Sequence, residues 1–452
     1  MNMKRVLVIA CFMVAMGTMA AFALGTRAQE VIVVRTERGF KPSVIQIHKG
    51  DTVVFVSTGA EFWPASDVHP THGIYSEFDP RTALQPHEQW KFRFDKAGVW
   101  SFHDHLEPQM RGKILVVGED GESIRECLEA RPGTIQPECW EAEVTTLIDT
   151  SGITEAFDAV KRWYSEMSEF QRNCHDVMHV IGTATYERYM QDESVTWRPE
   201  VSYCGWGFYH GFIERMFVRS GAGYFDEVLS YCAQLREVPE AAGAVGPCYH
   251  GIGHAVFDSL SSSLWGDDEA MVREAIGVCE RILPRVWERV RCASGVYNAL
   301  ANAYSARDYY LSFRDEEPIP TCGTQRPEYR NICYMEVGNG YIRDKHWGKE
   351  ESFNFISHIQ DIAARASVLQ GYMDTEVRRT IDSVEPPRFV QDCESFMHES
   401  DVQGCIDGVV VGIFNIAAPG KEWETASWFC DALHDASRQT HCRDVVDHGR
   451  EL

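Results

Sequence analysis

Fourteen of the 15 cysteines in this chain of 452 residues lie after residue 126, and this distribution constrains the fold more than any other feature. The remaining one is Cys11, and the stretch 12–126 has none. An even number of patterned cysteines in an exported chain is typical of disulfide bonds. We therefore expect two differently built parts, the second of them held together by disulfides.

A repeat is built on the later cysteines. Cys204, Cys248, Cys292 and Cys405 are each followed by Gly at the third position and by Gly or Ala at the seventh, and Cys333 departs from this only at the third. Small residues at these two positions lie on one face of a helix and allow a second helix to pack closely. The pattern predicts an α-helical repeat, or α-solenoid.

Most repeats also carry an earlier cysteine on the preceding helical segment, which favours sequential pairing. The favoured pairs are 127–139, 174–204, 232–248, 279–292, 322–333, 393–405 and 430–442. Spacing alone does not fix connectivity. A link of this length contributes about 3 kcal/mol in the chain-entropy model. We expect no free thiol in this part after export.

The repeat places ionisable side chains on one helical face, with histidines four residues apart. Two histidines at this spacing can chelate one metal ion. The candidate ligands are His175, His179, His210, Glu214, His250, His254 and Asp258. The alternative is a ladder of hydrogen bonds between packed helices. Stacking of equivalent positions predicts that His179, His210 and His254 share one polar pocket beside the two carboxylates.

The part before residue 118 has a different pattern. Short β-branched or aromatic runs alternate with turn residues, which predicts strands. The runs are 31–35, 44–48, 52–56, 89–94, 100–102 and 113–117. Strands of this kind over about ninety residues predict a β-sandwich.

This part resembles a known family. The stretches 40–42, 44–53, 92–98 and 110–116 are similar to those of a cupredoxin-like domain, the plastocyanin and azurin type of fold, and the resemblance spans residues 31–117. It implies a mononuclear copper at one end of the sandwich, bound by two His and one Cys, often with a weak axial Met. It also implies electron transfer as the usual activity.

The ligand loops depart from the family pattern. The closing loop contains His103, His105 and Met110 but no cysteine, and an earlier loop adds His69 and His72. A blue copper centre needs the thiolate, whereas imidazole-rich sites suit Cu(II) or Zn(II). These five residues are the candidate ligands of a cysteine-less site, which we expect to bind copper without an intense blue colour. The alternative is that the histidines only hydrogen-bond and rigidify their loops.

The N-terminus has the pattern of an export signal, with Lys4 and Arg5 ahead of a run without charges from residue 6 to 26. We expect residues 1–28 to be a cleaved signal peptide or a retained membrane anchor. The rest is then extracytoplasmic: periplasmic, at the cell surface or secreted. The expected domains are a cupredoxin-like domain at 30–118, a linker at 119–126 and a Cys-rich helical repeat domain at 127–452, a multidomain β + α fold.

The net charge of the chain limits the classes of partner that it can bind. The formal net charge of -24 repels phosphate backbones, which excludes nucleic acid as a partner, but it is compatible with cations. The first hypothesis is an exported copper-binding protein in copper handling or electron transfer, with a metal ion and a redox or protein partner. The second is an extracytoplasmic metalloenzyme with a second metal ion in the helical domain. The third is an interaction scaffold.

Overall fold

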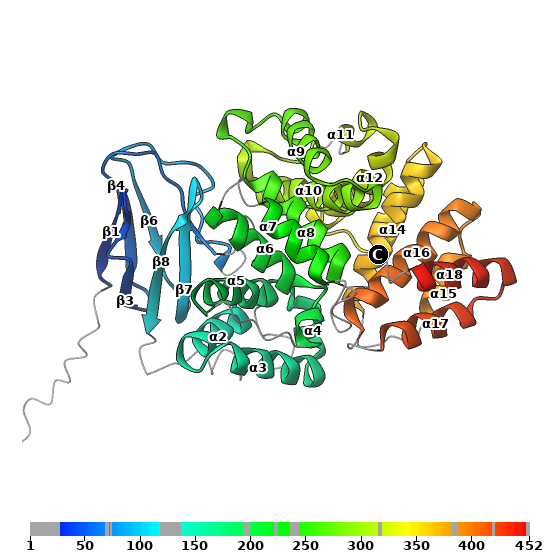
Figure 1. Cartoon of the computed structure of the whole chain (residues 1–452), viewed down its shortest axis with the longest axis horizontal. Coiled ribbons are helices and arrows are strands. Elements are labelled where there is room, and N and C mark those ends of the chain that lie inside the picture. Colours follow the sequence, from blue (N-terminus) through cyan, green and yellow to red (C-terminus); the bar gives the residue numbers. More distant parts are fainter. Residues whose placement is uncertain are drawn as a thin grey trace, which may run out of the picture.

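The computed structural model describes residues 28–67, 72, 75–117, 137–192, 199–220, 225–235, 244–314, 319–380, 387–417 and 421–448. Two differently built parts are present, a β-sandwich and a larger helical body against which the sandwich stands (Figure 1). The expected linker, and the expected signal segment up to residue 27, lie outside the described residues.

The sandwich contains strands where the sequence predicts them and two short strands that it does not. The strands are β1 (Glu30–Thr36), β2 (Gly39–Lys41), β3 (Val44–His48), β4 (Thr52–Ser57), β5 (Pro64–Ser66), β6 (Gln89–Arg93), β7 (Gly98–Asp104) and β8 (Glu107–Val117). Within the described residues they form two four-stranded sheets, in the orders β2-β1-β4-β6 and β3-β8-β7-β5. The pairs β1–β4 and β3–β8 are parallel, and the other pairs are antiparallel. The predicted β-sandwich is confirmed.

Aromatic side chains fill the space between the two sheets. Phe55, Phe78 and Phe102 are fully or almost fully buried, and the Phe78 ring stacks on Trp90 with centroids 5.6 Å apart. Phe78 lies in the segment between β5 and β6 that also carries His72, so its burial fixes this segment against the core. Ala142 belongs to the same apolar cluster, so the first described helix packs directly on the sandwich.

The helical part contains helices of very different lengths. The helices are α2 (Pro137–Thr150), α3 (Ile153–Glu166), α4 (Ser168–Asn173), α5 (His175–Asp192), α6 (Gly207–Ser220), α7 (Phe225–Gln234), α8 (Val245–Asp258), α9 (Asp268–Ile282), α10 (Val286–Ala306), α11 (Pro320–Gly323), α12 (Pro327–Asp344), α13 (Lys349–Ser357), α14 (Ile362–Arg379), α15 (Pro387–Glu394), α16 (Glu399–Ile416), α17 (Glu422–Ala432) and α18 (Ala436–His448). Short 3-10 turns are η2 (Pro199–Ser202), η6 (Ser262–Leu264) and η7 (Asp308–Tyr310). No helix in the described part of the chain combines the length and apolar composition needed to cross a membrane.

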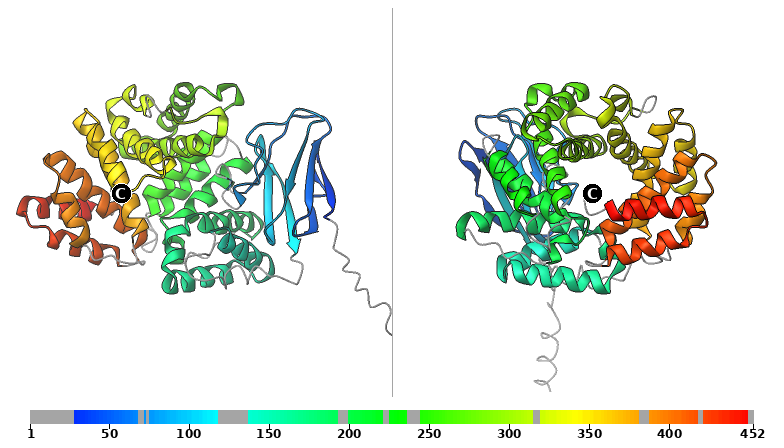
Figure 2. Two further views of the ribbon diagram at one scale, coloured as in Figure 1. Left: turned by 180° about the vertical axis from the view of Figure 1, so that it is seen from behind. Right: turned by 45° about the vertical axis from the view of Figure 1, so that its right-hand side comes forward.

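The longer helices pack in chain order, α5 on α6, then α8, α10, α12, α14 and α16. The right-hand view of Figure 2 shows the helices arranged in a ring. The hydroxyl of Tyr164 on α3 donates to the carbonyl oxygen of Ile416 at the end of α16, which joins the early helices to the late ones. The predicted helical repeat is confirmed, and it curves back on itself.

Six of the predicted disulfides are present: Cys174–Cys204, Cys232–Cys248, Cys279–Cys292, Cys322–Cys333, Cys393–Cys405 and Cys430–Cys442. Cys139 is also disulfide-bonded, and its expected partner, Cys127, lies outside the described residues. In five of the six, the two cysteines lie on consecutive helices, so the disulfide links a helical hairpin internally. Cys174 and Cys204 instead lie on either side of α5, 30 residues apart.

Candidate metal centres

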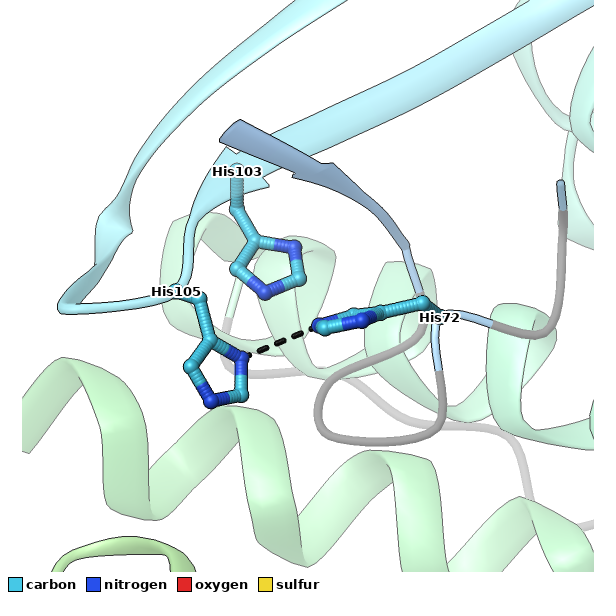
Figure 3. A group of neighbouring side chains, drawn as sticks. All are labelled: His72, His103 and His105. Atoms are coloured by element: carbon cyan, nitrogen blue, oxygen red, sulfur yellow. Dashed lines mark hydrogen bonds between the residues drawn. The ribbon is translucent and has the colours of Figure 1, made fainter. Parts of the chain in front are cut away.

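Three histidines of the sandwich meet at one end of it. His103 lies on β7, His105 follows in the turn to β8, and His72 comes from the segment between β5 and β6. The β7–β8 register shifts between His103 and Asp104. One ring nitrogen of each histidine lies within 4.8 Å of the other two, and His72 Nε2 is 3.0 Å from His105 Nδ1. Figure 3 shows the three rings turned toward a common centre.

Two buried aspartates orient these rings. His72 Nδ1 is 2.7 Å from Asp79 Oδ2, and His103 Nδ1 is 2.8 Å from Asp67 Oδ1. A carboxylate only accepts, so each Nδ1 carries a hydrogen, and Nε2 is the nitrogen of each ring that is left to bind a metal ion. Carboxylates behind histidine ligands are the usual supports of metal sites.

The charges at this end of the sandwich favour a cation. Burial lowers the pKa of His103 to about 4, so its ring is neutral at neutral pH. Burial alone would raise the pKa of Asp67, but Arg111 and His103 outweigh it and hold that pKa below its usual range. Asp79 behaves in the same way, because the hydrogen bond from His72 outweighs the effect of burial on its pKa. His103 is therefore a neutral donor backed by the charged carboxylate of Asp67.

Two further candidates of the sandwich are Met110 and His69. Met110 on β8 packs against the apolar core of the sandwich. His69 lies outside the described residues. Asp104, next to His103, accepts hydrogen bonds from the Trp63 backbone and from Arg35, so it anchors the β7–β8 turn. Sequence reasoning missed Asp67 and Asp79, since neither belongs to a spacing pattern typical of metal ligands.

A second histidine cluster lies in the helical part, on α5, α6 and α8. His179 Nε2 is 3.2 Å from His175 Nε2, and His210 Nδ1 is 3.3 Å from the same His175 atom. His254 Nε2 is 3.1 Å from His250 Nε2. The His210 ring centroid lies 5.3 Å from those of both His179 and His254, so the predicted convergence of these three is confirmed.

Carboxylates flank the second cluster. Glu214 Oε2 lies 3.4 Å from His179 Nδ1, and Glu214 Oε1 lies 3.9 Å from His254 Nδ1. Asp258 Oδ1 accepts a hydrogen bond of 3.2 Å from the Tyr309 hydroxyl. Burial raises the pKa of both carboxyls well above the usual range.

The histidines of this cluster are held neutral as well. Burial lowers the pKa of His175 to about 4 and that of His254 to about 3. It also lowers the pKa values of His179, His210 and His250. Five imidazoles therefore keep lone pairs available at neutral pH.

Comparison with known proteins finds likeness only among solved structures. No known family model matches this chain, and no curated protein matches it in sequence. Similar structures include a reduced amicyanin variant, 21% identical, covering 19% of this chain and 81% of that one at a TM-score of 0.17. A copper-containing nitrite reductase from Thermus scotoductus SA-01 is 23% identical, over 19% and 22% of the two chains, at 0.16. A purple cupredoxin from Nitrosopumilus maritimus is 18% identical, over 20% and 99%, at 0.17.

A cavity lies between the two histidine clusters. Its lining includes His105 and Asp67 of the sandwich and Glu214, Asp258 and Trp265 of the helical part. The ring of His105 lies 5.2 Å from that of Tyr309, measured between centroids, and Tyr309 donates to Asp258. The neighbouring Asp308 has a carboxylate oxygen within 4.8 Å of ligand atoms of His72 and Asp79. The helical part thus completes the surroundings of the sandwich site.

Proposed function

We propose that this chain binds copper through His72, His103 and His105 and serves in copper handling or electron transfer. The observation that carries the proposal is the convergence of three ring nitrogens within 4.8 Å at one end of the sandwich. Imidazole ligands suit Cu(II) and Zn(II), and the resemblance of residues 31–117 to cupredoxins favours copper. The buried aspartates behind His72 and His103 support the same role.

A copper ligand set of histidines without cysteine determines the properties of the bound ion. No cysteine lies in the sandwich part of the sequence, so bound copper lacks the thiolate of a blue centre. The resulting Cu(II) is held by neutral imidazoles beside negatively charged Asp67 and Asp79, which favours the divalent over the monovalent ion. The six disulfides support an extracytoplasmic location, where such bonds persist.

Copper loading of the full chain tests the proposal. We expect bound Cu(II) with weak absorption and without the intense thiolate band near ~600 nm that marks blue centres. The double variant His103→Ala with His105→Ala should bind one copper fewer per chain. His48→Ala, at the exposed end of β3, is the matched control and should bind as much as the unmodified chain. An intense blue band, or unchanged copper content in the double variant, contradicts the proposal.

A second candidate function, that of an extracytoplasmic metalloenzyme, is favoured by the cavity. Two carboxyls with raised pKa, Glu214 and Asp258, line it together with Arg111 and Arg215. Perturbed carboxyls in a cavity are typical of active sites. A screen for hydrolase and oxidase activity tests this function, with Glu214→Gln expected to abolish any turnover while copper binding in the sandwich persists. Activity that Glu214→Gln leaves unchanged contradicts it.

A further inference from the structure

The second histidine cluster contains a hydrogen-bonding conflict that a cation removes. His175 Nδ1 lies 2.8 Å from the carbonyl oxygen of Cys204. A carbonyl oxygen only accepts, so Nδ1 carries the hydrogen and Nε2 of the neutral ring has one lone pair. That lone pair faces two nitrogens at once, His179 Nε2 and His210 Nδ1. A single lone pair makes one good hydrogen bond, whereas a central cation accepts lone pairs from all three rings.

The distances agree with coordination. Two nitrogens bound to one tetrahedral ion at 2.0–2.1 Å are separated by about 3.3 Å. His175 Nε2 is 3.2 Å from the His179 atom and 3.3 Å from the His210 atom. All three candidate atoms lie within 4.8 Å of one another. The spacing is therefore that of three ligands on one ion.

The outer nitrogens of two of the three rings are supported in the manner of metal ligands. The Cys204 carbonyl fixes the tautomer of His175, and Glu214 lies behind His179 Nδ1. Behind the adjacent His250, Nδ1 donates to the Ser294 hydroxyl, which in turn donates to Glu336. Partners of this kind orient histidine ligands and raise their basicity.

In the later repeats, the same helix face carries residues that only form hydrogen bonds between helices. At the position of His210 and His254 they carry Asn298 and Asn339. Asn298 Nδ2 donates to Glu336 at 2.8 Å, and Asn339 Nδ2 donates to Thr375 at 2.9 Å. Each of these donors meets an oxygen acceptor, so this ladder needs no ion. At the equivalent positions the early repeats carry imidazoles in place of these amides, and the imidazole nitrogens face one another.

We propose that His175, His179 and His210 bind a divalent transition-metal ion, a second metal site in addition to that of the sandwich. Glu214 orients the ligands, because it lies against the outer nitrogen of His179. Glu214 also lines the cavity between the two histidine clusters, so the ion can reach the site from that cavity. The inference does not depend on copper in the sandwich, and it supplies the metal that the metalloenzyme function requires.

Zinc content of the full chain tests this site. The background is the variant His103→Ala with His105→Ala, which removes the sandwich ligands. We expect about one Zn(II) per chain after equilibration with micromolar zinc and gel filtration. Adding His179→Gln and His210→Asn should reduce binding at least 100-fold. The control adds His358→Asn and His434→Asn, both exposed, and should leave the zinc content unchanged.

A second readout covers the case in which the combined variant does not fold. His210→Asn alone copies the later repeats, and near-ultraviolet circular dichroism reports its folding. Co(II) in the background chain should give the strong ligand-field bands of a tetrahedral site, and His210→Asn should weaken them. Zinc content that His179→Gln with His210→Asn leaves unchanged, or a folded background chain that takes up neither Zn(II) nor Co(II), overturns the inference.

Discussion

At the scale of single residues, buried carboxylates determine which nitrogen of each sandwich histidine faces the metal position. Asp79 accepts from His72 Nδ1 at 2.7 Å and from the Trp63 indole at 2.8 Å. It is fully buried at its side chain, and Arg81 also reaches it. The position of the His72 lone pair therefore depends on a residue that does not itself need to bind the ion.

Asp79→Asn tests this dependence. The amide keeps the shape of the carboxylate but loses its charge and one of its two acceptor oxygens, so His72 loses its orientation. We expect copper affinity to fall 10- to 100-fold, the usual effect of removing such a support. Isothermal titration of the full chain with Cu(II) measures it. Glu77→Gln, an exposed carboxylate on the same segment, is the control and should change the affinity less than twofold. Equal affinities for the two variants would show that the carboxylate has no such role.

The buried histidines also predict an acid-sensitive fold in the metal-free chain. The folded-state pKa of His103, about 4, lies below the ordinary value of 6.5, so the unfolded state binds more protons between these values. Its contribution to stability is therefore lost as pH falls from about 6.5 to 4, at a cost of about 3 kcal/mol. The depressed pKa values of Asp67 and Asp79 act in the same direction, because the unfolded state again binds more protons, but only below about pH 4.

Urea unfolding of the metal-free chain between pH 7.5 and 5 measures this effect. We expect the free energy of unfolding to decrease steadily over this range. His254→Asn, which places the residue type of Asn298 at the equivalent position, should reduce the slope, since burial lowers the pKa of His254 to about 3. His358→Asn, at an exposed position, should leave it unaltered. A free energy of unfolding that is independent of pH is incompatible with buried neutral histidines.

At the scale of elements, glycines allow the helices that carry the second cluster to touch. A Cβ on Gly211 of α6 would lie 2.1 Å from the carbonyl oxygen of His179 on α5. That oxygen belongs to the backbone, so the helices would have to separate. On α9, a Cβ on Gly277 would meet only the flexible tip of Arg281, at 3.3 Å.

The same substitution at these two glycines should therefore have opposite effects. Gly211→Ala should lower the free energy of unfolding by about 3 kcal/mol or more, the cost of overpacking. Gly277→Ala should raise it by about 0.5–1 kcal/mol, the ordinary gain of alanine in a helix. Chemical denaturation of both variants provides the comparison. Similar effects at both sites would mean that the close approach of α5 and α6 contributes little.

The sequence predicts those elements whose pattern is local or repeated. Cysteine spacing indicated six disulfides correctly, and five of them join consecutive helices through cysteines 11–16 residues apart. The repeat also indicated the convergence of His179, His210 and His254, because equivalent positions of adjacent repeats stack on one another. Strands β2 and β5 were missed, since three residues are too few to show an alternation.

Other contacts of the candidate sites follow no local pattern. Asp67 and Asp79 reach the histidines through the path of a segment between strands, and no spacing in the sequence signals that path. Tyr309 reaches His105 from a turn about two hundred residues later. The contact of Tyr309 with His105 depends on how the two parts dock, which periodicity does not encode.

At the scale of the whole molecule, η7 joins the two parts. Tyr309 is 1% exposed and packs against His105, Trp265 and Phe257. Its backbone has a left-handed φ of 53° and that of Tyr310 a φ of 61°, a conformation that side chains rarely adopt. A strained turn that inserts a ring between two parts indicates that their relative position matters for the site.

Tyr309→Ala should loosen the docking of the sandwich. Loss of a buried aromatic ring costs about 3–5 kcal/mol, and here the loss falls on the interface. Hydrogen exchange should accelerate at the backbone amides of the β7–β8 turn, including that of His105. Tyr310→Ala is a close control, because its neighbouring side chain is 57% exposed and its backbone is equally left-handed. Unchanged exchange in Tyr309→Ala would show that the sandwich docks without this ring.

The central claim is a copper site of imidazoles without thiolate, and X-ray absorption at the copper edge tests it most directly. The sample is the full chain with His179→Gln and His210→Asn, loaded with one equivalent of Cu(II), so that the metal occupies the sandwich. We predict a first shell of nitrogen and oxygen at about 2.0 Å, with the outer-shell scattering of three imidazoles. A sulfur neighbour at about 2.3 Å, the length of a thiolate bond, or scattering from fewer than two imidazoles would contradict the claim.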